Sequence, residues 1–390
     1  MEQLVGLVDQ YYQRAERLRL FLQSNNNRIL SGMTTPDLAL LNTSVNNLSD
    51  ELDQTHQSII ALTKLSQEFS RYRYVMRMLE EMQRGLNSKQ QYEGRNILER
   101  WLINLANDSE PIFSERKLAE NYPATEKMRQ EMQEKGIGSE QKVDRILQLG
   151  REYVRLPEIP VVNNVRMVGG GIQVDDKLFE LEPRRMQLLL RLDPSVEKLA
   201  VVLVRYASLL PYGQQWSIPK VVYQYLVNRY GASVEGFASP INSQIITVRS
   251  DLKFCSLFPD IDSPYGSIGS FFNPELDTYF YNRTTVINPP FVPAVLDRMA
   301  ARVNQLCDNA TEPVRFFVWV PDWTDAEWFG ALMNSRHRVF ETRLNRGNYY
   351  YTDVEGKRIP ANFPSHIFVL AVNFTDDYRD LTRKLLELYR

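Results

Sequence analysis

Residues 284–291 read Thr-Thr-Val-Ile-Asn-Pro-Pro-Phe, and the interpretation of the whole chain starts from this stretch. Its first four residues are all β-branched, which favours a buried β-strand. The Asn-Pro-Pro segment cannot continue that strand, because proline has no backbone N–H and asparagine favours turns. The sequence therefore predicts a strand that delivers a rigid polar loop to the edge of a sheet.

The loop carries groups that suit an exocyclic amino group. The Asn288 side-chain oxygen and the Pro289 carbonyl can each accept one hydrogen of an adenine N6 amino group, which leaves the nitrogen lone pair free. Pro289 and Pro290 fix the backbone before a substrate arrives. Phe291 can stack on the base, an interaction worth roughly 1–3 kcal/mol. We predict Asn288, Pro289, Pro290 and Phe291 as catalytic residues, the alternative being a turn that only ends a strand.

Other short motifs stand around this loop in a fixed order. They are Val-Glu-Gly-Phe-Ala-Ser-Pro-Ile-Asn at 234–242, Phe-Pro-Asp-Ile-Asp at 258–262, Tyr-Gly-Ser-Ile-Gly at 265–269 and Phe-Phe-Val-Trp-Val-Pro-Asp-Trp at 316–323. Together with Asn-Pro-Pro-Phe they resemble the catalytic module of the phosphorylated-CTD-interacting-factor family, the cap-specific adenosine N6-methyltransferases. The resemblance covers about residues 199–373.

The resemblance implies an S-adenosyl-L-methionine-dependent N6-methyltransferase acting on adenosine in RNA, in the best-known members the adenosine beside the mRNA cap. It also implies an α/β fold, a Rossmann-like methyltransferase core that here follows a mainly helical N-terminal domain. Gly236 and Tyr265 replace a cysteine and a phenylalanine of the family pattern, and neither change touches the catalytic loop. Because we find no Trp-Trp module before the core, we expect the catalytic module without the WW domain.

The first cofactor loop would follow the strand at Ser233 to Phe237, where small rigid residues take the place of a glycine-rich turn. Carboxylates near it could accept hydrogen bonds from the cofactor's ribose or adenine, although aspartates in such stretches are often turn formers. The residues expected to bind the cofactor are Glu235, Phe237, Ala238, Ser239, Pro240, Asn242, Asp260, Asp262, Tyr265, Gly266 and Ser267.

Four residues are expected to bind substrate: Arg205, Trp323, Arg336 and His337. Arg205 lies on an apolar helix and needs a partner, either a ligand anion or a structural carboxylate such as Glu235 or an aspartate. Trp323 follows a strand that ends at the ligand-binding edge, where it either walls the base pocket or covers the sheet. Arg336 and His337 begin a basic, aromatic stretch typical of a nucleic-acid rim.

Composition limits the class of protein. The 390 residues are 43% hydrophobic and 24% charged, with a net charge of −2, as in an ordinary folded protein. Two cysteines provide neither a disulfide framework nor a zinc site, so we expect no metal and an intracellular protein of the nucleus or cytoplasm. The start lacks a basic leader, and no apolar run approaches the roughly 20 residues of a membrane span.

We divide the chain into a helical domain at 1–150, a hairpin and helical connector at 151–230, and the methyltransferase domain at 231–390. The first helix should stop in the polar run at 24–27, and Thr35 should cap a second helix. From about Thr43 to Asn87 the apolar spacing predicts a long, coiled-coil-like helix. It would serve homodimerisation or a protein partner, or simply pack on the core.

Two other functions fit the same residues. The Asn-Pro-Pro-aromatic loop also serves DNA adenine N6-methyltransferases, because it carries no information on the ribose 2′-hydroxyl. A non-catalytic scaffold, with the long helix as its partner-binding element, is the third hypothesis. The requirement for a cap, the sequence context and the oligomeric state stay open at this point.

Overall fold

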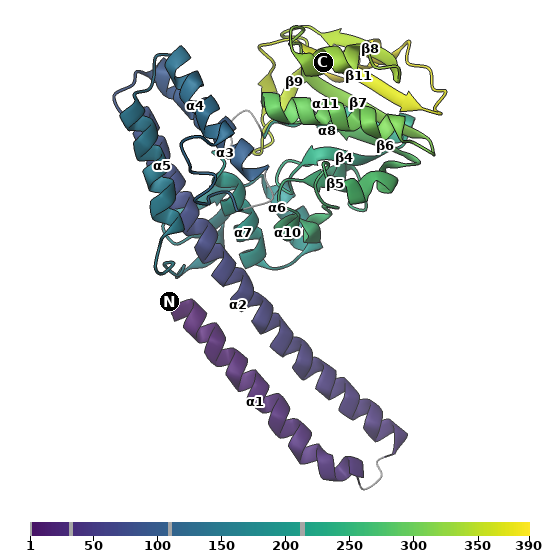
Figure 1. Cartoon of the computed structure of the whole chain (residues 1–390). Coiled ribbons are helices and arrows are strands. Elements are labelled where there is room, and N and C mark those ends of the chain that lie inside the picture. The colour runs from purple at the N-terminus through teal and green to yellow at the C-terminus, as the bar shows by residue number, and fades with distance from the viewer. Residues whose placement is uncertain (1, 31–33, 108–110, 211–214) are drawn as a thin grey trace.

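The computed structural model describes residues 2–30, 34–107, 111–210 and 215–390. Within these ranges the chain is a mixed α/β protein, with helices before residue 155 and a six-stranded sheet towards the C-terminus (Figure 1). The predicted α/β class with a helical N-terminal region is confirmed. The N-terminal helices are α1 (Glu2–Leu30), α2 (Thr35–Gln83), α3 (Ser88–Ala106), α4 (Pro123–Glu134) and α5 (Glu140–Val154).

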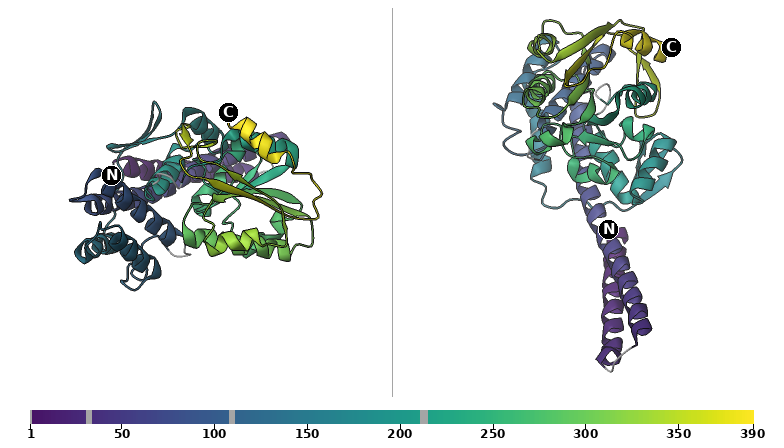
Figure 2. Two further views of the ribbon diagram at one scale, coloured as in Figure 1. Left: turned by 90° about the horizontal axis from the view of Figure 1, so that it is seen from above. Right: turned by 90° about the vertical axis from the view of Figure 1, so that its right-hand side faces the viewer.

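Helix α1 and the first half of α2 lie side by side and form an arm that projects from the rest of the molecule (Figures 1 and 2). The predicted end of α1 at 24–27 is wrong: the Ser24 hydroxyl and Asn25 amide donate to the Phe21 carbonyl within the helix, which continues to Leu30. The predicted cap is also one residue off, since the Thr34 hydroxyl accepts the Asp37 N–H.

Apolar side chains remain exposed along this arm. Val5, Tyr12 and Leu40 are 50%, 68% and 70% exposed, because a pair of helices cannot enclose a core on all sides. A homodimer or a protein partner on the arm remains a prediction.

The second half of α2 is buried in the body of the protein. Leu62, Leu65 and Val75 are fully buried there, in one core with α3, α5 and the connector. Helix α3 starts with a capping box, in which Asn87 and Gln90 satisfy each other's backbone N–H groups. Its inner face buries Trp101, which fixes the helix against the following segment.

A small sheet and three helices connect the two ends of the chain. The strands pair in the order β1-β2-β3, all antiparallel, so the hairpin predicted within the connector gains a third strand. Helix α8 ends at Gly231, whose φ of +65° is a conformation that favours glycine. The connector comprises β1 (Val165–Val168), β2 (Gly171–Val174), β3 (Lys177–Glu180), α6 (Pro183–Leu192), α7 (Val196–Ala207) and α8 (Lys220–Tyr230).

The main sheet has the strand order β5-β4-β6-β7-β11-β8. β5, β4, β6 and β7 are parallel, and β11 runs antiparallel between β7 and β8. Its strands are β4 (Ala232–Ala238), β5 (Lys253–Ser256), β6 (Arg283–Ile287), β7 (Val314–Pro321), β8 (Arg338–Leu344) and β11 (Ser365–Val372), and a separate pair is β9 (Tyr350–Thr352) with β10 (Arg358–Pro360).

The chain leaves β4 towards β5 on one side and returns to β6 on the other, so the strand order reverses at β4. In open sheets ligands bind at the carboxyl ends of the strands beside such a reversal. Helices cover both faces of the sheet (Figure 1). The remaining elements are α9 (Ile245–Val248), α10 (Pro259–Asp262), the 3₁₀ turns at Ser263–Tyr265 and Pro274–Phe280, α11 (Pro293–Asp308), α12 (Glu327–Met333) and α13 (Leu381–Leu388).

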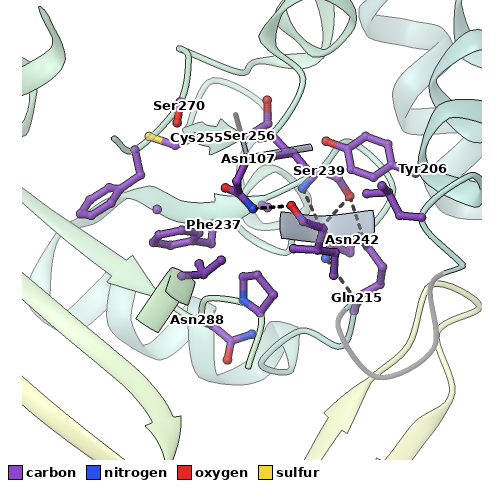
Figure 3. A pocket seen from close by; sticks show the side chains of 18 of the residues that line it. Asn107, Tyr206, Gln215, Phe237, Ser239, Asn242, Cys255, Ser256, Ser270 and Asn288 are labelled. Atoms are coloured by element: carbon purple, nitrogen blue, oxygen red, sulfur yellow. Dashed lines mark hydrogen bonds between the residues drawn. The ribbon is translucent and has the colours of Figure 1, made fainter. Parts of the chain in front are cut away.

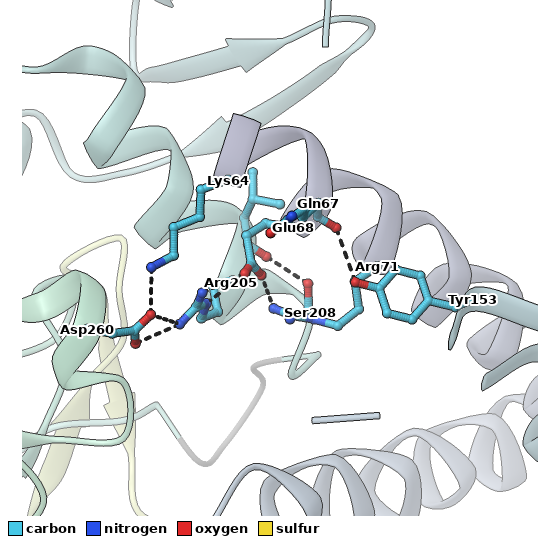
Figure 4. A network of polar contacts seen from close by, with 9 residues as sticks. Lys64, Gln67, Glu68, Arg71, Tyr153, Arg205, Ser208 and Asp260 are labelled. Atoms are coloured by element: carbon cyan, nitrogen blue, oxygen red, sulfur yellow. Dashed lines mark hydrogen bonds and ion pairs between the residues drawn. The ribbon is translucent and has the colours of Figure 1, made fainter. Parts of the chain in front are cut away.

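An ionic cluster around the buried carboxylate of Glu68 joins α2 to α7 (Figure 4). The Arg205 guanidinium donates to Glu68 at 2.6 and 3.0 Å and to Asp260 at 2.8 Å. Glu68 also accepts from Arg71, and Lys64 donates to Asp260 at 2.7 Å. Because Glu68 serves two arginines while almost wholly buried, it holds the helical region against the connector.

We expect Glu68→Gln to lower the free energy of unfolding by about 3–5 kcal/mol, since two guanidinium groups then lose their buried counter-charge. Asp260→Asn is the control: its side chain is 50% exposed, so its loss should cost at most about 1 kcal/mol. Urea unfolding of both variants measures the difference. Equal losses would contradict the assignment of the cluster to Glu68.

Candidate functional site

Two adjoining cavities lie at the carboxyl ends of the parallel strands, where the fold predicts ligand binding. Three segments line the inner cavity: residues 236–239 at the end of β4, residues 255–257 at the end of β5, and residues 270–272 further along the chain (Figure 3). The outer cavity is lined by the loop 288–291, by α3 and by the aromatic residues Tyr351 and Phe363. Trp216, Asn288 and Pro290 line both cavities and so mark the boundary between them.

Asn288 has an amide of defined orientation. Its Nδ2 donates to the backbone carbonyl of Trp216 at 3.1 Å. A carbonyl only accepts, so the nitrogen must face it and Oδ1 must face away. Oδ1 is shielded from solvent and has no hydrogen-bond partner among the described residues. An acceptor in that state is costly unless a ligand donates to it. Because Asn288 also lines both cavities, its Oδ1 indicates a binding site.

Pro289, Pro290 and Phe291, the rest of the predicted catalytic loop, line the outer cavity. Strand β6 ends at Ile287, and the two prolines then hold the loop extended until α11 begins at Pro293. The Phe291 ring lies 5.8 Å from Phe363 and 6.3 Å from Tyr351, each edge to face. Tyr351 is itself stacked on Trp216 at 6.2 Å. Aromatic side chains thus line part of the outer cavity, which suits the stacking of a planar ring.

Four of the predicted cofactor residues line the inner cavity: Phe237, Ala238, Ser239 and Asn242. Asn242 Oδ1 accepts from the Ser239 N–H at 2.7 Å and from its hydroxyl at 2.8 Å, which closes the turn after β4. Asn242 also donates to the Gln215 carbonyl at 3.2 Å. Figure 3 shows these side chains on the wall opposite Phe237. Pro240 belongs to the same turn but does not line the cavity.

Glu235 is not a cavity residue, contrary to the expectation. It is 2% exposed and accepts from the Tyr223 hydroxyl at 2.7 Å, the Ser243 hydroxyl at 2.8 Å and the Gln244 and Ile245 N–H groups. Burial raises the pKa of this carboxyl, although its hydrogen bonds oppose the shift. Its protein partners occupy both oxygens, so Glu235 stabilises the start of α9.

The motif at 258–262 supports the cavity from outside. Asp260 forms the ion pairs with Arg205 and Lys64, and Asp262 accepts from the Tyr206 hydroxyl at 2.7 Å. Neither aspartate lines the inner cavity, whereas Tyr206 does. Burial raises the pKa of Asp262 to about 7. Asp260 lines a neighbouring cavity, which shares Leu257, Ser270 and Phe272 with the inner one, so a direct contact of this carboxylate with a cofactor stays a prediction.

Tyr265, Gly266 and Ser267 form an irregular edge beside β5 and do not line the inner cavity either. The Phe254 N–H donates to the Gly266 carbonyl at 3.3 Å, and Gly266 has a φ of +103°. The Ser267 hydroxyl lies 2.7 Å from that of Ser256, which is a lining residue. This motif therefore holds β5 and its last serine in place.

The four residues expected to bind substrate lie in separate parts of the structure. Arg205 binds the carboxylates of Glu68 and Asp260, so the structural alternative describes it, with an aspartate but not Glu235 as partner. Trp323 is 43% exposed and lies 6.5 Å from the Phe291 ring, outside the residues that line the outer cavity. It borders the catalytic loop without forming the pocket wall.

Arg336 and His337 lie at the other end of the sheet. Both contact Asp308 at 2.7 Å, at the end of α11. The His337 carbonyl accepts from the Ala371 N–H, and Ala371 pairs with the start of β7. Since the cavities are at the carboxyl ends of the strands, neither residue can reach them in this structure.

Helix α3 is the part of the site that the sequence interpretation missed. Tyr92, Asn96, Glu99, Ile103 and Asn107 follow one another at three- or four-residue intervals and line the cavities, the first three the outer and the last two the inner one. Leu98 and Trp101 on its apolar face pack in the core, and no site residue was expected on the opposite stripe. The sequence signal for that stripe was the helical spacing of mainly polar residues.

No group of His, Cys, Asp and Glu side chains among the described residues is arranged to hold a metal ion. In the same ranges, none of the helices has the length and apolar character needed to cross a membrane.

Comparison with known proteins relates one part of the chain to a family. The family model described as "Phosphorylated CTD interacting factor 1 WW domain" matches residues 191–354. A Mus musculus protein named mRNA (2'-O-methyladenosine-N(6)-)-methyltransferase is 32% identical over 158 residues, which are 39% of this chain and 19% of that protein. The Homo sapiens protein of the same name is 34% identical over 113 residues, 29% and 15% of the two chains. The similarity thus spans less than a fifth of these curated relatives.

These matches support the resemblance stated from the motifs, and they correct one part of it. The expected absence of the WW domain is contradicted, because the model that carries this description matches inside the chain. The expectation concerned a short Trp-Trp module before the core, whereas the match covers α7, α8 and every strand of the main sheet except β11.

Asp262 predicts a pH dependence of stability. Its pKa is about 7 in the fold and about 3.9 when unfolded, so between these values only the unfolded state is ionised and stability falls as pH rises. We expect Asp262→Asn to remove this loss, up to about 1.4 kcal/mol per pH unit, while Tyr206 keeps an acceptor. Thermal unfolding of the variant and the wild type at pH 5 and pH 8 measures this difference in stability. If the variant gained no stability relative to the wild type at pH 8, the assignment of a buried, protonated Asp262 would be contradicted.

Proposed function

We propose that this protein is an S-adenosyl-L-methionine-dependent N6-methyltransferase that acts on adenosine in RNA, and in particular on the adenosine beside an mRNA cap. The observation that carries the proposal is the unpaired, solvent-shielded Oδ1 of Asn288 at the boundary of two cavities. The names of the mouse and human relatives, both adenosine N6-methyltransferases on mRNA, support the choice of reaction and substrate.

The inner cavity fits the cofactor by its chemistry. Phe237, Phe271 and Phe272 offer apolar ring faces for a purine, with Phe237 at 5.1 Å from Phe271. Ser256 and Ser270 add hydroxyls at the far end from Asn288 (Figure 3). S-adenosyl-L-methionine supplies an electrophilic methyl group when bound. The parallel strands with a reversal at β4 and the antiparallel β11 support a Rossmann-like core for residues 231–390, after a helical domain at 1–150 and a connector at 151–230.

Residues of this chain orient the adenine amino group that receives the methyl. Asn288 Oδ1 and the Pro289 carbonyl take the two amino hydrogens of adenine, which leaves the N6 lone pair directed at the inner cavity. The aromatic residues around Phe291 hold the ring and exclude water. The proton released from N6 can pass to solvent, so the site does not require a histidine base.

RNA is preferred over DNA because of the relatives' names, while the loop itself does not distinguish the two. An enzyme acting on mRNA would be found in the nucleus or the cytoplasm. A non-catalytic scaffold is the least favoured alternative, because a relic would have no reason to retain an unpaired acceptor at the end of β6.

The proposal is tested by methyl transfer from labelled S-adenosyl-L-methionine to matched oligonucleotides. They are capped RNA beginning with 2′-O-methyladenosine, the same RNA uncapped, and single- and double-stranded DNA. We expect transfer to the N6 of the cap-adjacent adenosine. Transfer to DNA alone would replace RNA by DNA as the substrate, and no transfer together with no thermal shift on adding the cofactor would overturn the enzymatic function.

We expect Asn288→Ala to reduce methyl transfer by at least 100-fold and to leave cofactor affinity nearly unchanged, because the lost acceptor acts on the amino group rather than on the cofactor. Single-turnover rates and calorimetric titration with S-adenosyl-L-methionine measure the two effects. Asn348→Ala, an exposed asparagine outside both cavities, is the matched control. A parallel loss of cofactor binding in Asn288→Ala would contradict the role given to Asn288.

A further inference from the structure

We propose that the polar stripe of α3, with Asn96 at its centre, is a purine-recognition surface that reads a ring nitrogen of the target adenine. The inference rests on the proposed function. The stripe belongs to the helical N-terminal region, far before β4 in the sequence, yet three of its residues line the same cavity as the catalytic loop. Two distant segments of the chain thus enclose one binding pocket.

Asn96 has the free hydrogen-bonding groups that such a contact needs. It is half-buried in the wall of the outer cavity, and within the described residues its side chain forms no hydrogen bond. The catalytic loop occupies the amino hydrogens of adenine, so the acceptors beside the amino group that remain for recognition are the ring nitrogens N1 and N7. The Asn96 amide can donate to one of them, as asparagine does when it binds adenine elsewhere.

Charged side chains of both signs follow Asn96 in the wall of the outer cavity. Glu99 is 1% exposed and lines the cavity one turn after Asn96. Arg100 lines it too and donates to Glu131 of α4 at 3.1 Å. The wall beside Asn96 therefore presents a carboxylate and a guanidinium next to each other.

The position of α3 is fixed from both sides, as a recognition surface requires. Its inner face buries Leu98 and Trp101 in the main core. On the other side Ile103 packs against Val292 and Val295, the residues that immediately follow the catalytic loop. The helix and the loop therefore keep a constant separation, set by apolar contacts.

The test combines a protein variant with an altered substrate. The full chain carrying Asn96→Ala is compared with the wild type on capped RNA whose first nucleotide is adenosine, 1-deazaadenosine or 7-deazaadenosine. We expect the variant to bind the adenosine RNA about tenfold more weakly and to show an equal fall in kcat/KM, with unchanged cofactor affinity. With one of the two deaza substrates, the wild type should lose about the same factor in binding as Asn96→Ala loses with adenosine. Asn96→Ala should bind that deaza substrate as well as it binds adenosine RNA, because the same hydrogen bond is already absent.

Controls separate recognition from folding and from the proposed function. Glu93→Ala lies on the same helix outside both cavities and should change neither binding nor transfer. Asn96→Asp keeps the shape but removes the donor, so it should reproduce Asn96→Ala if the latter unfolds. Equilibrium binding of the RNA is read independently of transfer: a tenfold loss of binding without any methyl transfer in the wild type would overturn the enzyme and retain the recognition surface. Full binding by Asn96→Ala and Asn96→Asp, or losses that multiply with both deaza substrates, would overturn the proposal.

Discussion

The hydrogen bond from Asn288 Nδ2 to the Trp216 carbonyl is the constraint on which the site depends. It turns the amide so that Oδ1 has no hydrogen-bond partner between the two cavities. The folded protein thereby leaves a buried acceptor unsatisfied, which costs stability. The strand before it and the two prolines after it leave the asparagine little freedom. An acceptor held in place before its ligand arrives needs little reorganisation when an amino group binds.

The site also depends on how the helical region is held. α3 is held beside both cavities by Ile103, which packs on the segment after the catalytic loop, and the pair of Glu68 with Arg205 joins α2 to α7. Several residues of the ordered motifs act in the same indirect way: Glu235 anchors α9, and Asp262 orients Tyr206, which does line the inner cavity. Much of the motif pattern therefore preserves the framework around the cavities rather than contacts to a ligand.

The elements with strong local signals were predictable from the sequence, including the long helix α2, the strand β6 and the rigid loop after it. Helix ends were less so, since a side-chain hydrogen bond such as that of Ser24 can continue a helix through a polar run. Most of the incorrect predictions concerned which residues contact each other in the folded chain. Arg336 and His337 had suitable chemistry but lie at the wrong end of the sheet, and the contribution of α3 required knowing which distant segment packs on the loop.

The most direct test of the central claim is a crystal structure of the protein with S-adenosyl-L-homocysteine and a capped RNA beginning with adenosine. The account predicts adenine in the outer cavity against Phe291, its N6 within about 3 Å of Asn288 Oδ1, and the bond from Nδ2 to Trp216 retained. An adenine bound elsewhere, or an Asn288 amide rotated so that Nδ2 faces the base, would contradict it.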